Sequence, residues 1–241
     1  MSEPMVIPLA PGVWRVPTTP MDLVNTFVFR DDDGQVTLVD AGLANAPKRI
    51  LAALASLGSD PSDVTRIVLT HGHSDHVGGA AELVRATGAD VTVHAGDAAT
   101  VRAGRAPELD RSTLAGRLLK RGVGAKAVAV AEELQDGQVI DVGGGLRVVH
   151  TPGHSPGHVS LLHEPSRLLI TGDALWNMRR RLTWPVLSFC TDIRMTQETA
   201  HVLGDLDYDL VAFTHGPEIR VGAREAVRGF LRDPRGFRAG F

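Results

Sequence analysis

Cysteine is almost absent from this sequence. The 241 residues include a single cysteine, Cys190, so no disulfide bond can form within the chain. A domain without disulfides is typical of a reducing compartment. No apolar run approaches the roughly 18 residues of a membrane span, and the first residues, MSEPMVIPLAPGVW, lack the basic and apolar regions of a signal peptide. The sequence therefore predicts a cytoplasmic protein that does not enter the membrane.

An excess of positive charge is also absent. Lysine and arginine total 25 against 28 acidic residues, which gives a formal net charge of -3. Such a chain offers no basic field for a polyanion, so nucleic acid is not expected as a partner. We expect a small-molecule substrate instead. The composition leaves the oligomeric state open, including assembly into a homo-oligomer.

Short apolar stretches separated by turn residues fill the first forty positions and predict strands at 6–9, 13–16, 23–29 and 36–39. A helix is expected from about 45 to 58, followed by alternating strands and helices. A second β-rich series begins near residue 139 and repeats the order of strands, with helices near 195–206 and 223–231. Two such halves predict an α/β (α+β) fold in which two sheets pack face to face between helices, a four-layer αββα sandwich.

A helical segment interrupts this order between the two halves. Residues 106–131 carry Leu114, Leu118 and Leu119 at helical spacing, with Asp110 as a candidate N-cap and basic residues on the other sides. We therefore predict a single domain over residues 1–241 in which 106–131 form an inserted helical segment.

Histidine is abundant, with ten residues against one tyrosine. Residues 71–76 read HGHSDH and directly follow an apolar strand pattern that ends at Leu69. Four candidate ligands thus lie within six residues of a loop. Imidazole and carboxylate groups are ligands that zinc and iron accept, so this loop predicts a metal site.

Three further candidates also follow apolar strands. His154 lies in HTPGH, Asp173 in TGD and His215 in THG. A glycine beside each allows close approach of the backbone. Because functional groups gather at strand ends, we expect these three to join the HGHSDH loop.

The motifs HGHSDH, TPGHSPGH, TGD and THG, in that order, resemble those of the metallo-β-lactamase superfamily, and Asp40 resembles the first structural motif of that family. The resemblance covers nearly the whole chain. It implies an αββα sandwich with metals in the cleft between the halves. It also implies a specific ligand set: His71, His73 and His154 on one metal, Asp75, His76 and His215 on the other, and Asp173 bridging both.

This ligand set implies a hydrolase with two Zn²⁺ ions, with iron or a mixed-metal pair as the alternative. Zinc lowers the pKa of a bound water to about 7, so a metal-bridging hydroxide can attack a polarised carbonyl. Asp75 is the predicted catalytic residue, because it can orient this nucleophile or receive its proton. A protein nucleophile is not expected, since Ser74 lacks a GxSxG context and Cys190 has no histidine near it in sequence.

Two classes of function remain open within this resemblance. The first is hydrolysis of an ester, a lactone or a thioester, and the second is a mononuclear iron oxygenase similar to persulfide dioxygenases. The stretch after His215 is short compared with the helical glutathione-binding region of glyoxalase II enzymes. Acyl homoserine lactone lactonases have a tyrosine three residues beyond the bridging aspartate, where this sequence has Trp176. The physiological substrate and the native metal therefore stay undetermined.

The segment that follows Asp173 is rich in apolar and aromatic residues, from Trp176 to Phe189. Trp176 and Trp184 are predicted to line a substrate pocket together with the inserted helix. The run Arg179-Arg180-Arg181 suggests contact with a substrate carboxylate, but a charged run is more often only solvated.

Overall fold

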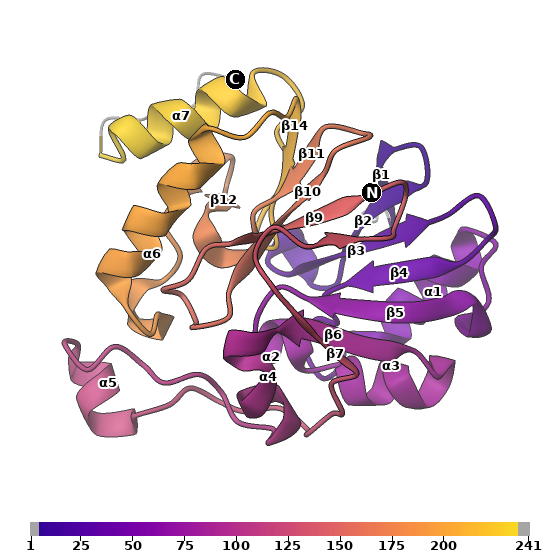
Figure 1. Ribbon diagram of the computed structural model, residues 1–241, viewed down its shortest axis with the longest axis horizontal. Coiled ribbons are helices and arrows are strands. Elements are labelled where there is room, and N and C mark those ends of the chain that lie inside the picture. The colour runs from indigo at the N-terminus through magenta and orange to yellow at the C-terminus, as the bar shows by residue number, and fades with distance from the viewer. Residues whose placement is uncertain (1–4, 236–241) are drawn as a thin grey trace.

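The computed structural model describes residues 5–235 and contains two sheets packed between helices (Figure 1). The first sheet has seven strands in the order of the chain, antiparallel from β1 to β4 and parallel from β4 to β7. Its strands are β1 (Ile7–Ala10), β2 (Val13–Pro17), β3 (Asn25–Arg30), β4 (Val36–Val39), β5 (Val64–Leu69), β6 (Asp90–His94) and β7 (Glu132–Leu134).

The second sheet has five strands in the order β14-β11-β10-β9-β8, and only the pair β11 and β14 is parallel. A separate hairpin is formed by β12 and β13. These strands are β8 (Val139–Ile140), β9 (Leu146–His150), β10 (Val159–His163), β11 (Leu168–Ile170), β12 (Trp176–Met178), β13 (Arg181–Thr183) and β14 (Leu210–Ala212).

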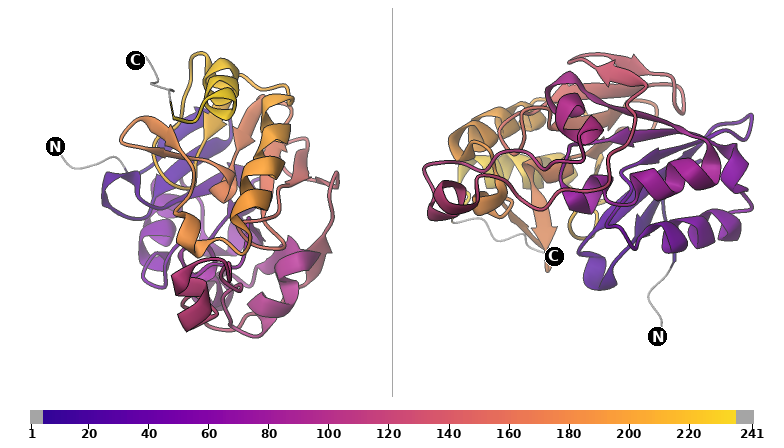
Figure 2. Two further views of the ribbon diagram at one scale, coloured as in Figure 1. Left: turned by 90° about the vertical axis from the view of Figure 1, so that its left-hand side faces the viewer. Right: turned by 90° about the horizontal axis from the view of Figure 1, so that it is seen from below.

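Helices cover the outer faces of both sheets. In Figures 1 and 2, α1 and α3 lie on one side of the molecule, while α6 and α7 lie on the other. No helix within residues 5–235 combines the length and the apolar character needed to cross a membrane. The helices are α1 (Pro47–Ser56), α2 (Ser74–Val77), α3 (Ala80–Thr87), α4 (Ala95–Arg102), α5 (Leu114–Leu119), α6 (Ile193–Thr199) and α7 (Ala223–Arg232); short 3-10 helices span Pro20–Asp22, Pro61–Asp63, Gly172–Ala174, Leu187–Phe189 and Ala200–Gly204.

Alternating side chains along the strands explain the layers. On β5, Ile67 and Leu69 belong to the core beneath α1 and α3, whereas Val68 belongs to the core between the sheets. On β10, Leu161 faces the other sheet, and Leu162 joins a third core beneath α7. Because successive side chains of a strand point to opposite faces, each sheet buries both faces. Three cores between four layers confirm the predicted αββα sandwich.

Some elements differ from the sequence prediction. The helix expected at 195–206 begins at Ile193 and changes to a 3-10 turn at Ala200, and α4 was not predicted. The α4 sequence, AGDAATVR, is rich in alanine and lacks an apolar stripe, so its helical signal is weak. The expected pocket loop after Asp173 contains the β12–β13 hairpin.

The segment between β6 and β7 contains α5, which extends away from the two sheets (Figure 1). Its N-cap is Thr113 and not Asp110. Leu109 N donates to Lys120 O at 2.9 Å, which closes the base of a loop that carries α5. The α5 leucines are exposed by 68–73%. The helix therefore contributes little to the core.

Candidate metal centre

The predicted ligands meet at one end of the two sheets. His71 follows β5, His154 follows β9, Asp173 follows β11 and His215 lies beyond β14. The short helix α2 begins directly after His73 and carries the other two, Asp75 and His76. The structure thus brings all seven predicted ligand residues together, although they come from both halves of the sandwich.

The seven side chains form overlapping groups. His71, His73 and His154 place one ligand atom each within 4.8 Å of one another; this set is called the three-histidine group below. Asp75, His76 and His215 satisfy the same distance limit. His71 also forms such a set with His76 and Asp173, so the two groups are neighbours.

Asp173 lies between the two groups. Its Oδ2 is 3.2 Å from His154 Nε2, while its Oδ1 is 3.3 Å from His215 Nε2 and 3.5 Å from His76 Nε2. Two ligands of one zinc ion at about 2.0 Å and a tetrahedral angle lie about 3.3 Å apart. Each oxygen of Asp173 is therefore at ligand-to-ligand distance from a different group.

Unpaired buried nitrogens provide the test of whether a metal fits. Nε2 of His71, His76 and His215 is buried and has no hydrogen-bond partner within residues 5–235, while His73 faces the cluster with Nδ1, 2.9 Å from His154 Nε2. A buried polar atom without a hydrogen-bond partner costs about 1–3 kcal/mol, so three in one cluster demand a common explanation. Nitrogen and carboxylate donors in this arrangement fit a metal ion.

The charges in the cluster also favour a cation. Burial lowers the pKa of His71 and His73 well below its usual range, which keeps both rings neutral. Burial acts against protonated His76 as well, but carboxylates led by Asp173 raise its pKa to about 10. Burial alone would raise the pKa of Asp173, yet His215 and the other rings hold it well below its usual range. The carboxylates therefore give the site a strong affinity for positive charge.

The far side of several rings is fixed by other residues. Asp40 Oδ2 is 2.8 Å from His76 Nδ1, and Asp40 Oδ1 accepts a hydrogen bond from Thr70 N. Asp40 adopts a left-handed backbone, with φ of 64°, which is uncommon outside glycine. His158 Nε2 accepts from Asp173 N at 2.7 Å, and Thr214 Oγ1 donates to Asp173 Oδ1 at 2.7 Å. Such partners orient metal ligands.

Cys190 lies behind one predicted ligand. Its Sγ is 3.4 Å from His154 Nδ1, on the side of the ring away from Asp173. Sequence reasoning found no histidine near Cys190, because the two residues are 36 positions apart. The thiol is fully buried, so it contacts the ligand ring and not a substrate.

A cavity of about 270 Å³ opens over the cluster. Asp75, whose side chain is 32% exposed, and Asp173 lie on its polar side. The ring centroids of Trp176 and His215 lie 4.3 Å apart. The apolar wall includes Leu43 from the loop after β4, Leu109 and Val123 from the inserted segment, and Trp176 and Phe189 from the segment after Asp173.

Trp184, the second predicted pocket residue, lies elsewhere, and so does the arginine run that was expected to be solvated. Trp184 packs on Phe230 of α7 with 5.0 Å between ring centroids, in the core under that helix. Arg179 and Arg180 form the exposed turn of the β12–β13 hairpin, and Arg181 begins β13. None of these four residues lines the cavity over the cluster. Of the two predicted tryptophans, only Trp176 reaches it.

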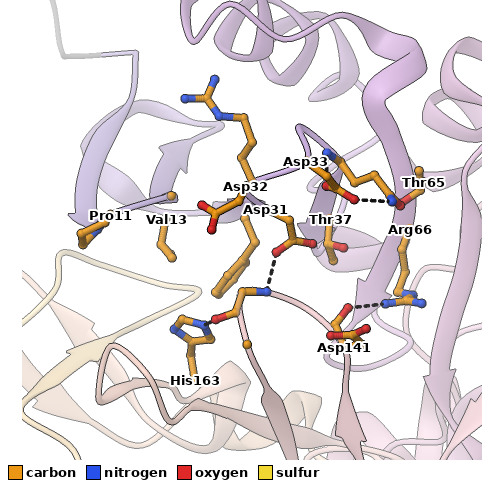
Figure 3. A pocket seen from close by; sticks show the side chains of 16 residues that line it. Pro11, Val13, Asp31, Asp32, Asp33, Thr37, Thr65, Arg66, Asp141 and His163 are labelled. Atoms are coloured by element: carbon orange, nitrogen blue, oxygen red, sulfur yellow. Dashed lines mark hydrogen bonds between the residues drawn. The ribbon is translucent and has the colours of Figure 1, made fainter.

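A larger hollow of about 680 Å³ lies at the opposite end of β4 and β5 (Figure 3). Asp31, Asp32, Asp33 and Asp141 line it. Several of its polar groups already have partners; for example, Asp31 Oδ1 accepts a hydrogen bond from Gly143 N. Size alone therefore does not identify the site, and the chemistry lies in the smaller cavity.

Comparison with known sequences agrees with this geometry. Residues 19–215 match the family described as the metallo-beta-lactamase superfamily. The probable metallo-hydrolase YybB of Bacillus subtilis is 30% identical over 197 residues, which cover 81% of this chain and 82% of that protein. A hydroxyacylglutathione hydrolase of Anaeromyxobacter dehalogenans is 41% identical over 143 residues, or 59% of this chain. The chain spans only 43% of the length of that hydrolase.

Solved structures share the fold over most of the chain. A metallo-beta-lactamase mutant from Cronobacter sakazakii superposes with a TM-score of 0.68 at 25% identity, covering 96% of this chain and 87% of that one. A metallo-beta-lactamase family protein from Thermus thermophilus superposes with a TM-score of 0.69 at 24% identity. The superposition covers 94% of this chain and 80% of that one. The sequence match, the αββα architecture and the histidine–aspartate cluster agree, and this chain belongs to the metallo-beta-lactamase superfamily as a metallo-hydrolase.

Proposed function

We propose that the protein hydrolyses an ester, lactone or thioester with an apolar acyl group, using two zinc ions. The observation that carries this proposal is the position of Asp173, whose two oxygens each lie near a different histidine group under an apolar-walled cavity. Relatives named hydroxyacylglutathione hydrolase act, by their name, on an acyl derivative of glutathione, which supports acyl transfer to water.

The residues of the cluster would have separate roles in binding metal and in activating water. The three-histidine group would hold one ion, Asp75, His76 and His215 would hold the other, and Asp173 would contact both. When bound, the ions would polarise the carbonyl and lower the pKa of water to about 7. Asp75 Oδ2 lies 3.5 Å from His215 Nε2, and the partly exposed carboxylate borders the cavity. Asp75 is therefore suited to orient the attacking water and accept its proton.

The apolar wall would position the acyl group. Leu109 and Val123 come from the inserted segment, and Phe189 comes from the segment beyond the hairpin. Contacts with the remote part of a substrate can hold its carbonyl at the reacting centre. The polar groups of the cavity floor remain available for the carbonyl and the leaving group.

Metal content is the first test. We expect two zinc ions per chain in purified protein, measured by mass spectrometry of metals against protein concentration, because two ligand groups share Asp173. Such protein should hydrolyse at least one member of a panel of short esters, lactones and thioesters. A single tightly bound iron, with oxygen consumption on a persulfide and no hydrolysis, would replace this proposal with the oxygenase alternative.

Substrate preference tests the cavity wall. Trp176→Ala should change the ratio of kcat/KM between long and short acyl chains by about 10-fold, the scale of a lost apolar contact in a pocket, while metal content stays the same. Trp184→Ala is the matched control, since that ring packs on Phe230. It should lower the melting temperature and leave the preference unchanged. Equal changes in preference for both variants would contradict the assignment of Trp176 to the wall.

A further inference from the structure

We infer that Asp97 is a positioning residue that locks two ligand-bearing loops together and so supports the three-histidine group. The inference rests on the proposed two-metal function, and it adds a residue that none of the metal motifs includes. Asp97 lies in the first turn of α4, outside every motif that predicted a ligand. Its side chain has no solvent exposure.

The carboxylate of Asp97 accepts three hydrogen bonds from two different loops. Oδ2 accepts from Gly72 N at 2.8 Å and from Ser155 Oγ at 2.6 Å. Oδ1 accepts from Gly157 N at 2.7 Å. Gly72 lies between His71 and His73, while Ser155 directly follows His154. One side chain thus ties the first sheet's ligand loop to that of the second.

The environment of Asp97 shows that this contact is specific. Burial raises the pKa of Asp97, and its three donors oppose that shift. No lysine or arginine within residues 5–235 forms an ion pair with it, so the hydrogen bonds must compensate for the loss of water. A Cβ on Gly157 would lie 2.4 Å from Asp97 N, and a Cβ on Gly96 would lie 2.7 Å from Pro156 O. Glycine at both positions allows α4 to approach the loop this closely.

The other ligands have different supports. His76 Nδ1 contacts Asp40, His215 Nδ1 contacts the carbonyl of Leu23, and Asp173 accepts from Thr214. None of these contacts involves Asp97. Loss of the Asp97 carboxylate should therefore affect the three-histidine group most, because Gly72 and Ser155 directly adjoin ligands of that group, whereas His76 and His215 keep their own supports.

The substitution Asp97→Asn tests this with little change in shape. Asparagine presents an NH₂ group to at least one backbone or hydroxyl donor, so at least one of the three hydrogen bonds that join the two loops is lost. We expect the dissociation constant of one zinc ion to rise about 10- to 100-fold, as for other outer partners of metal ligands, while the second ion is retained. Titration with a competing chelator would measure both constants. Leu54→Ala, in the buried core of α1, is the control for general loss of stability.

Amide exchange in metal-free protein provides a readout that needs no metal. The amides of Gly72 and Gly157 should exchange faster in Asp97→Asn than in the wild type. In Leu54→Ala their exchange should not become faster than in the wild type. Unchanged exchange rates of these two amides in Asp97→Asn would overturn the inference. So would an equal rise of both zinc dissociation constants in Asp97→Asn and in Leu54→Ala. If the wild type binds fewer than two metals and the amides still respond, the positioning role stands and the proposed two-metal function fails.

Discussion

Replacing Asp75 by asparagine is expected to lower kcat about 10²- to 10⁴-fold in protein that keeps both metals, the range for loss of a general acid or base. Asparagine keeps one oxygen that can contact a metal but cannot accept a proton from the attacking water. The Asp75 carboxylate is the one predicted ligand with a side chain about a third exposed, and it borders the cavity where the carbonyl would lie. Because this carboxylate reaches the cavity, Asp75 can act as a base toward the attacking water in addition to its predicted role as a metal ligand.

The measurement is kcat at saturating zinc, with metal content determined on the same samples. Ser74→Ala is the matched control, because Ser74 is the neighbouring residue and lines the same cavity. This control should retain activity within a few-fold of the wild type. Full recovery of Asp75→Asn activity on addition of zinc would leave Asp75 with a ligand role alone.

Removal of metal is expected to cause a large loss of stability. An ion present at about 1,000 times its dissociation constant stabilises the folded state by about 4.1 kcal/mol, which corresponds to roughly 8–16 °C in melting temperature for a chain of this size. The physical reason is the set of buried nitrogens without hydrogen-bond partners on His71, His76 and His215, each of which costs free energy when no ion is bound.

Thermal unfolding with and without a chelator measures this effect. His154→Ala removes one ligand of the three-histidine group, so its melting temperature should fall less on chelation than that of the wild type. His201→Ala, at an exposed position far from any ligand motif, should behave as the wild type does. An unchanged melting temperature after mass spectrometry has verified that the metal is gone would contradict the prediction.

The sequence predicted the sandwich because its signals are local. Strand patterns such as 36–39 appear with the same bounds in β4, and the continuous apolar run Ile67, Val68 and Leu69 predicted a buried strand, which the structure buries on both faces. The ligand motifs follow buried strands directly, so their positions at strand ends could be inferred from the order of residues. Weak local signals failed, as in the alanine-rich α4.

Contacts between residues far apart in sequence were decided only by the tertiary structure. Asp97 and Gly157 are 60 positions apart, and Trp176 and Trp184 look equivalent in sequence although one borders the cavity and the other packs on Phe230. By itself the sequence determined the αββα architecture and its family, because both depend on periodicity and short motifs. Which partners stand behind the ligands and which aromatics face the cavity depended on how two sheets and their helices dock, since side-chain packing across layers leaves no periodic signal along the chain.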